Sequence, residues 1–133
     1  MTRVLFAGKI PLLIQSAYAL VHQAQAAAIA RVGPGVPLKQ VDAAARDVIA
    51  AAGLGGAFGH GVGHGLGRQV HEPPAMGPHA AKGRLEPGMV VTIEPGVYLK
   101  GRFGIRIEDN VLVTETGRRV LSRLEKDPEA MVL

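Results

Sequence analysis

Three histidines stand close together in the most glycine-rich part of the 133-residue chain. His60, His64 and His71 lie in the segment GHGVGHGLGRQVHEPP, and His79 follows outside it. The glycines that alternate around His60 and His64 argue against a helix, and in an extended strand residues four apart face the same side. Imidazoles held on one side of a glycine-rich backbone are suited to metal ligation or to proton transfer.

Two glutamates occupy equally unusual places, because each interrupts an apolar run. Glu94 lies in VVTIEPG and Glu108 lies in IRIEDNVLV. An unpaired buried carboxylate is costly, so each is expected to have a cation or a strong hydrogen-bond donor nearby. Strand alternation places Glu94 on one face with Thr92, and it groups Glu108 with Arg106 and Asn110. If the two strands are neighbours, the two glutamates converge.

One imidazole and two carboxylates make a set of hard nitrogen and oxygen ligands. Such a set suits manganese, cobalt, iron or zinc better than copper. The same residues also have structural interpretations, because Arg106 is an obvious ion-pair partner for Glu108 and a histidine among glycines can satisfy backbone groups or lie exposed in a loop. The spacing alone leaves a metal site and a structural arrangement both open.

The composition narrows the class of protein. The chain has no cysteine, which excludes disulfides, a thiolate zinc site and a cysteine nucleophile. Its formal net charge is +4, but the basic residues are scattered and aromatic residues are few, so nucleic-acid binding is not expected. Neither a phosphate-binding glycine motif nor a serine-nucleophile motif occurs. The apolar stretch 10–20 is too short and too interrupted to span a bilayer, so no membrane partner is expected and the expected location is the cytoplasm.

The sequence around these residues predicts two helices and several short strands. A strand is expected over 2–7 and helices over 11–31 and 38–52, with Gly53 ending the second helix. Segments 90–99 and 104–113 are expected to be two strands joined by a turn. A further turn at 116–117 precedes a short strand at 120–121, and the tail after Glu125 is expected to be frayed.

Each helix is expected to pack through an apolar stripe. The stripe of the first consists of Leu13, Ala17, Leu20, Val21, Ala24 and Ala28. The stripe of the second consists of Leu38, Val41, Ala45, Val48, Ile49 and Ala52. On the opposite side of the second helix the expected residues are Lys39, Asp42, Arg46 and Asp47.

Three segments, in this order along the chain, resemble the pita-bread metallopeptidases, especially aminopeptidase P and Xaa-Pro dipeptidase. They are GHGVGHGLGRQVHEPP, LEPGMVVTIEPGVY and GIRIEDNVLVTETG. The resemblance starts at MTRVLFAGK, which is similar to the family's strand just after a metal-binding aspartate, and it extends to about Leu121. It implies an α+β pita-bread (creatinase/aminopeptidase-like) fold, incomplete, with two helices packed on a curved antiparallel sheet. Residues 1–133 would then be the carboxyl-terminal portion of a catalytic domain.

The resemblance also implies a metal site. His64 matches a histidine ligand, Glu94 matches a glutamate ligand that also serves as a proton acceptor, and Glu108 matches the glutamate that bridges two metal ions. The implied cofactor is a divalent metal, manganese or cobalt first, with zinc or iron as alternatives. The full family site holds two ions, and at most one is expected here.

Three further residues gain implied roles. His60 and His71 are similar to the family's supporting histidines, which contact the substrate and help to orient or protonate groups in the transition state. They are therefore grouped with Glu94 as catalytic. Arg106, in the IRIED motif, looks like a neighbour that holds the carboxylates, and a purely structural ion pair is an equal interpretation for it.

The implied activity is hydrolysis of the peptide bond before proline by a metal-bound hydroxide. The substrate would be a peptide with proline at the second position, Glu94 would take a proton from water, and His71 would help to deliver one to the departing nitrogen. The alternatives are a noncatalytic pita-bread binding protein and a hydrolase similar to methionine aminopeptidase or creatinase.

The chain departs from the family pattern in its aspartates. The family completes its site with two aspartates, of which the second would fall immediately before Met1, and neither is present. None of the four aspartates of the chain replaces them; these are Asp42, Asp47, Asp109 and Asp127. The isolated chain is therefore expected to have negligible peptidase activity, and uncovered strands and apolar faces favour a homodimer or self-association.

Overall fold

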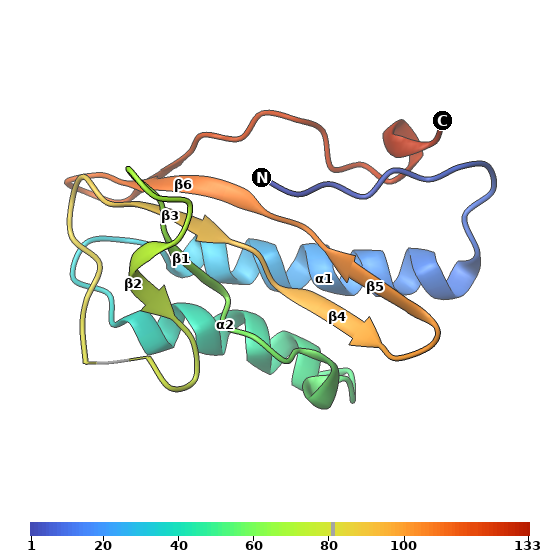
Figure 1. The fold of residues 1–133 in the computed structure, drawn as a ribbon, viewed down its shortest axis with the longest axis horizontal. Coiled ribbons are helices and arrows are strands. Elements are labelled where there is room, and N and C mark those ends of the chain that lie inside the picture. The colour runs from blue at the N-terminus through green and yellow to red at the C-terminus, as the bar shows by residue number, and fades with distance from the viewer. Residues whose placement is uncertain (81) are drawn as a thin grey trace.

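The computed structural model describes residues 1–80 and 82–133 and shows two long helices against one face of an antiparallel sheet (Figure 1). In chain order the elements are α1 (Leu12–Arg31), α2 (Leu38–Ala51), the 3-10 turn η1 (Gly55–Ala57), β1 (Gly63–Gly65), β2 (Glu72–Met76), β3 (Val90–Ile93), β4 (Gly96–Leu99), β5 (Phe103–Arg106), β6 (Asp109–Val113), β7 (Arg118–Val120) and the 3-10 turn η2 (Glu129–Met131).

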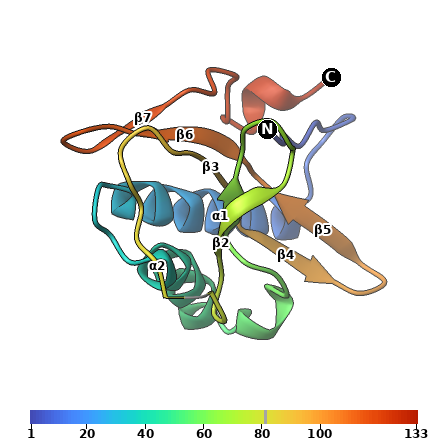
Figure 2. The same ribbon diagram turned by 60° about the vertical axis from the view of Figure 1, so that its left-hand side comes forward.

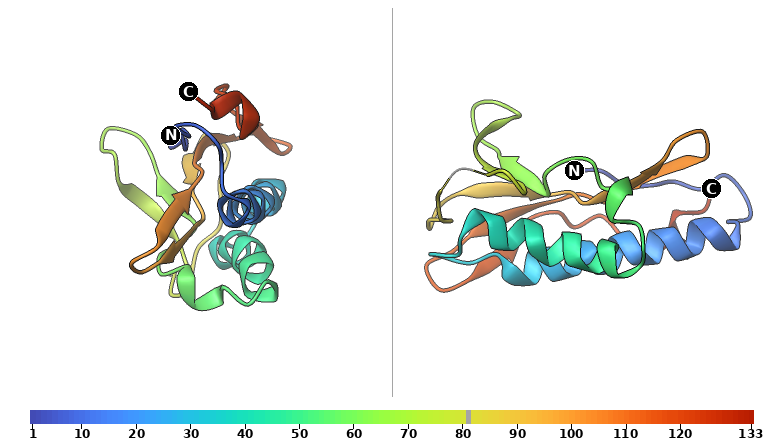
Figure 3. Two further views of the ribbon diagram at one scale, coloured as in Figure 1. Left: turned by 90° about the vertical axis from the view of Figure 1, so that its right-hand side faces the viewer. Right: turned by 90° about the horizontal axis from the view of Figure 1, so that it is seen from below.

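The two helices lie side by side and cover the same face of the sheet (Figure 3). Pro11 and Pro37 stand directly before them, where a fixed φ and a missing N–H cost nothing. Helix α2 is followed by Gly53 with a φ of 77°, the left-handed conformation that favours glycine after a helix. Both predicted helices and the predicted stop are confirmed. In the described residues, no helix combines the length and apolar character needed to cross a membrane.

The predicted faces of the two helices are correct in their centres and wrong at Leu13, Asp42 and Ala52, of which Ala52 lies just past the end of α2 and is exposed. Leu13 is 48% exposed in the first turn of α1, and the buried face of that helix includes Gln25. The amide of Gln25 can be buried because its Nε2 donates to the Ile93 carbonyl at 3.2 Å. In α2, Asp42 is only 2% exposed, so its predicted place on the solvent side is wrong. An ion pair with Arg46 makes this burial tolerable.

The sheet is built on one long, interrupted hairpin. Each predicted long strand is in fact two strands, because the first arm breaks at Glu94–Pro95 and the second at Ile107–Glu108. Proline has no N–H to donate at the break. The pairs Val90↔Leu112 and Gly96↔Arg106 keep the same register on both sides of it. The five-stranded sheet has the order β2-β1-β3-β6-β7, and β4 and β5 continue the hairpin beyond it (Figure 2).

The two ends of the chain run alongside each other next to β6, as Figure 1 shows. The predicted strand over 2–7 is replaced by two isolated bridges, Thr2↔Glu108 and Phe6↔Val132, because its partners come from different segments. The predicted fraying of the tail is also wrong. Met131 is buried and accepts a hydrogen bond from the Phe6 N–H at 2.9 Å.

A buried aspartate joins these ends to the sheet. Asp109 is fully buried, and its two carboxylate oxygens contact Arg3 Nη2 and Lys126 Nζ, each at 2.7 Å. The Lys126 carbonyl accepts a hydrogen bond from the Tyr18 hydroxyl at 2.9 Å, and burial raises the pKa of that phenol. Asp109 therefore points away from Glu108, as strand alternation predicts, and holds both terminal segments.

Acidification is expected to destabilise the protein through His22 on α1. Burial, followed by the charge of Lys126, lowers the pKa of this imidazole from its ordinary 6.5. The unfolded chain therefore binds the proton more tightly, so the free energy of unfolding falls as the pH drops below 6.5 toward the folded pKa. Urea unfolding of the wild type and of His22→Gln across this range checks the effect. The variant should show a flatter pH dependence, and superimposable curves would contradict the expectation.

Candidate active site

The glycine-rich strand β1 presents His64 to the hairpin. A Cβ added to Gly63 would overlap the Thr92 carbonyl oxygen, so β1 can lie this close to β3 only with glycine there. The backbone N–H of His64 donates to Thr92 Oγ1 at 3.0 Å, which fixes the histidine against the strand that carries Glu94. The expectation of extended backbone is confirmed at His64, which lies in β1, whereas His60 and His71 lie in bends outside any strand.

His64 and Glu94 are in direct contact. His64 Nε2 lies 3.0 Å from Glu94 Oε1, and the Thr92 hydroxyl donates to the same oxygen at 3.0 Å. The other ring nitrogen, Nδ1, lies 2.9 Å from the Gly65 carbonyl oxygen, which can only accept, so Nδ1 carries a proton. Metal-binding histidines commonly donate one ring N–H in this way and ligate with the other nitrogen. Nε2 is thus the nitrogen that a cation beside Glu94 would meet.

Glu108 lies opposite Glu94 in the hairpin. The register on both sides of the interruption brings these residues face to face, and side chains directly opposite share one face of an antiparallel pair. Backbone groups here bond outside the hairpin: the Glu94 N–H donates to Val62, and Glu108 exchanges N–H···O bonds with Thr2. The two predicted carboxylates therefore converge on one side of the sheet.

The Glu108 carboxylate is held by the beginning of the chain. It accepts hydrogen bonds from the Thr2 hydroxyl and lies 3.2 Å from the Met1 amino nitrogen. Burial raises the pKa of this carboxyl, but the bonds from Thr2 and Met1 and the nearby charge of Arg106 outweigh it, so the pKa lies below its ordinary value. Glu108 is therefore ionised at neutral pH, with its two oxygens engaged by Thr2 and Met1.

A cavity of about 290 Å³ joins these groups, and its walls include His64, Glu94 and Glu108. Asn110 also lines it, and its Oδ1 is buried without a hydrogen-bond partner in the described part of the chain. Among the described residues, no three His, Asp or Glu side chains lie close enough to form a metal site. The oxygens and the imidazole nitrogen are nevertheless the donor types that a divalent cation takes, and an orphaned acceptor fits a cation nearby.

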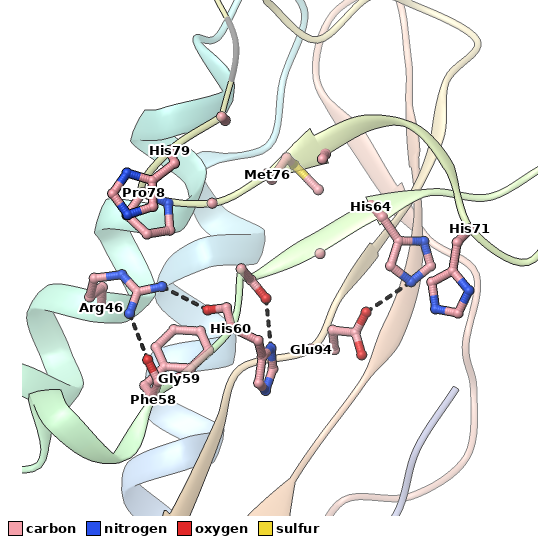
Figure 4. Close-up of a pocket in the computed structure, with 15 residues that line it drawn as sticks. Arg46, Phe58, Gly59, His60, His64, His71, Met76, Pro78, His79 and Glu94 are labelled. Carbon is pink, nitrogen blue, oxygen red and sulfur yellow. Dashed lines mark hydrogen bonds and ion pairs between the residues drawn. The ribbon is translucent and has the colours of Figure 1, made fainter.

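His60 and His71 flank this pair from two sides. They line a larger cavity of about 690 Å³ together with His64 and Glu94, as Figure 4 shows. The ring centroids of His71 and His64 are 4.4 Å apart. His60 Nδ1 lies 2.8 Å from the Gly61 carbonyl, so Nδ1 carries a proton and Nε2, 3.0 Å from Tyr98 Oη, accepts from that hydroxyl in the neutral ring. His79 lines the far part of the same cavity.

Arg106 is placed at the open side of the small cavity. Its Nε lies 3.9 Å from Glu94 Oε2, a long ion pair, and the side chain is 43% exposed. Its charge also reaches Glu108, whose pKa it lowers. Arg106 therefore lies beside both carboxylates, and its ion pair is with Glu94.

Replacing Thr92 with valine is expected to loosen the His64–Glu94 pair. The change keeps the shape of the side chain and removes the hydroxyl that bonds both Glu94 and the His64 N–H. Leaving these partly buried groups without a partner should cost up to about 1–3 kcal/mol of unfolding free energy. Urea unfolding measures the loss. Thr114→Val, in the turn that follows β6 and outside the linings of both cavities, is the control, and equal effects of the two changes would contradict the expectation.

Comparison with known proteins settles the family. The model of metallopeptidase family M24 matches residues 1–115. The chain belongs to this family. An uncharacterized peptidase of Bacillus subtilis, YqhT, is 44% identical over 126 residues, which cover 95% of this chain and 35% of the relative.

Solved structures agree on the fold of this M24 chain. A prolidase from Thermococcus sibiricus matches with a TM-score of 0.91 and 41% identity, over 98% of this chain and 35% of that one. An X-Pro aminopeptidase from Thermotoga maritima matches with a TM-score of 0.93 and 37% identity, over 98% of this chain and 36% of that one. The predicted pita-bread architecture is confirmed. The chain spans about a third of the length of the relatives it matches.

The sequence pattern does not indicate the residues that support His60 and the backbone next to it. The sequence pattern places Tyr98, which bonds His60, only in a strand, and it places Asp42 and Arg46 only on a solvent face. One signal was available for the latter two, since Asp and Arg four residues apart on a helix commonly pair. Nothing in the spacing indicates that this pair is turned inward.

Proposed function

We propose that this M24 chain carries the histidine and glutamate part of the active site of a metal-dependent peptidase that cleaves the bond before proline. The observation that carries the proposal is the contact of His64 Nε2 with Glu94 Oε1 at 3.0 Å, with Glu108 facing Glu94 across the hairpin. The similar proteins described above include a prolidase and an X-Pro aminopeptidase, which supports a substrate with proline at the second position.

His64, Glu94 and Glu108 would hold the cation, as an imidazole and two carboxylates, and we infer manganese or cobalt first from this hard donor set. A divalent cation bound there would polarise the scissile carbonyl and activate a water molecule. Because Met1 and Thr2 occupy the oxygens of Glu108, a rearrangement at this carboxylate would accompany binding. At most one ion is expected.

The remaining residues would handle protons and the substrate. Glu94 would accept a proton from water, since it lines the small cavity and its Oε2 lies 3.9 Å from Arg106 Nε. His71, exposed and next to His64, would deliver a proton to the prolyl nitrogen as it leaves. His60, with its Nδ1–H held by a carbonyl, would contact the peptide from the larger cavity.

Metal titration of the isolated chain tests the proposal without depending on turnover. Calorimetry with Mn²⁺ or Co²⁺ should show one bound ion, and His64→Ala or Glu94→Ala should weaken binding by about tenfold or more. His79→Ala, which removes a histidine from the far part of the larger cavity, should leave binding unchanged. Saturable binding that survives both ligand substitutions would overturn the assignment, as would the absence of binding to the wild type.

Hydrolysis of a Xaa-Pro peptide by the isolated chain is expected to be negligible, since two of the family's ligands are not among its residues. The cytoplasmic location and the self-association inferred from sequence stay predictions.

A further inference from the structure

The geometry points to the Asp42–Arg46 pair of α2 as a positioning element for the active site, acting on His60 directly and on Glu94 through Val62. We infer this role from the contacts of the pair with the segment 58–62, and its catalytic meaning rests on the function proposed above. The pair lies outside the group of side chains that face the small cavity.

The guanidinium of Arg46 donates hydrogen bonds to three groups. Nε and Nη2 bond the Asp42 carboxylate at 2.8 and 3.0 Å. Nη1 donates to the Phe58 carbonyl at 2.9 Å and Nη2 donates to the His60 carbonyl at 2.8 Å. The flat fork of an arginine can make all four bonds at once, and a lysine cannot. Arg46 thus fixes the carbonyl of Phe58, two residues before His60, and the carbonyl of His60 itself.

The ring of Phe58 contacts both the Arg46 guanidinium and the His60 imidazole. The Arg46 guanidinium lies 4.2 Å from the centroid of the Phe58 ring, and that ring meets His60 edge-on with centroids 5.1 Å apart (Figure 4). Tyr98 also contacts His60, with its hydroxyl 3.0 Å from Nε2. The imidazole therefore contacts two aromatic rings, and Arg46 packs on one of them.

Asp42 extends the same arrangement to Glu94. Its Oδ1 accepts the backbone N–H of Val62 at 3.0 Å, and the Val62 carbonyl accepts the backbone N–H of Glu94 at 2.7 Å. Val62 is fully buried and lies two residues before His64. Val62 thus connects α2 to the hairpin at the point where the hydrogen-bond ladder of the hairpin is interrupted. Asp42 is buried for this reason, at the cost of needing Arg46 beside it.

The orientation of the His60 ring is the property to measure, because a merely stabilising ion pair would leave it unchanged. Nitrogen NMR of the imidazoles of the wild type should show His60 as a single form with the proton on Nδ1. In Arg46→Met and in Arg46→Lys the His60 ring should no longer hold one tautomer, and its nitrogen signals should be averaged between the two tautomers. Lys39→Met removes an exposed cation from the same helix and should leave His60 unchanged.

The double variant Asp42→Asn/Arg46→Met covers the case in which Arg46→Met does not fold. It has no unpaired buried charge and keeps an oxygen for the Val62 N–H, but it lacks the donors to the Phe58 and His60 carbonyls, so the His60 form should again be lost. An unchanged His60 signal in a folded variant of Arg46 would overturn the inference. Cobalt binding lost in His64→Ala tests the proposed function separately, since neither result depends on the other.

Discussion

Replacing Asp109 with alanine is expected to lower the free energy of unfolding by about 3–5 kcal/mol, because it leaves two cations without their shared partner. Arg3 and Lys126 each lie 2.7 Å from this carboxylate, and Arg3 is only 5% exposed. Both terminal segments reach β6 through these contacts. Urea unfolding monitored by circular dichroism measures the loss.

The control for this change is Asp47→Ala, which removes an exposed carboxylate from the surface of α2. Such a change is expected to stay within about 0.5 kcal/mol of the wild type. If Asp109→Ala lowers the free energy of unfolding no more than Asp47→Ala does, then Arg3 and Lys126 do not depend on the Asp109 carboxylate. The variant should also loosen the Thr2–Glu108 contact, because Arg3 donates to the Glu108 carbonyl at 2.8 Å.

Replacing Gly63 with alanine is expected to cost about 3 kcal/mol or more, at the upper end of overpacking effects. The added Cβ would overlap the backbone of Thr92, and the hydroxyl of Thr92 would lie only 3.1 Å away. Backbone atoms in the middle of a sheet cannot move aside cheaply, so β1 must separate from β3. That separation would also move His64 away from Glu94, and metal affinity should fall together with stability.

Gly59 offers a matched control for the same substitution in the same segment. A Cβ at that position would meet no atom of the described residues within 4 Å, and its φ lies outside the left-handed region. Gly59→Ala should therefore be neutral or slightly stabilising, since it reduces the freedom of the unfolded chain. Equal unfolding midpoints for the two alanine variants would contradict the role assigned to Gly63.

The sequence was sufficient to predict the parts of the site that follow from periodicity. Alternation along one strand groups Glu94 with Thr92, alternation along the other separates Glu108 from Asp109, and the short turn between the arms makes them neighbours. Both helices were predictable because prolines and a glycine mark their ends. These features depend only on residues close in the chain.

The parts that could not be predicted depend on distant partners. The burial of Asp42 depends on the backbone of Val62, twenty residues later. The tail is ordered because Lys126 forms an ion pair with Asp109 and because Met131 is buried in the core. The residues at 2–7 are β-prone, but no single strand lies along them, so they form two bridges in place of a ladder. Local composition contains no information on any of these pairings.

The hairpin also limits how the length of this region can vary. Glu94 faces Glu108 because both arms, counted from the three-residue turn at 100–102, have the same number of residues on each side of the interruption. One residue inserted into a single arm would turn one glutamate to the helix-covered face, whereas an insertion in the turn would leave both in place. Related chains should therefore tolerate added residues at the turn and exclude them from the arms.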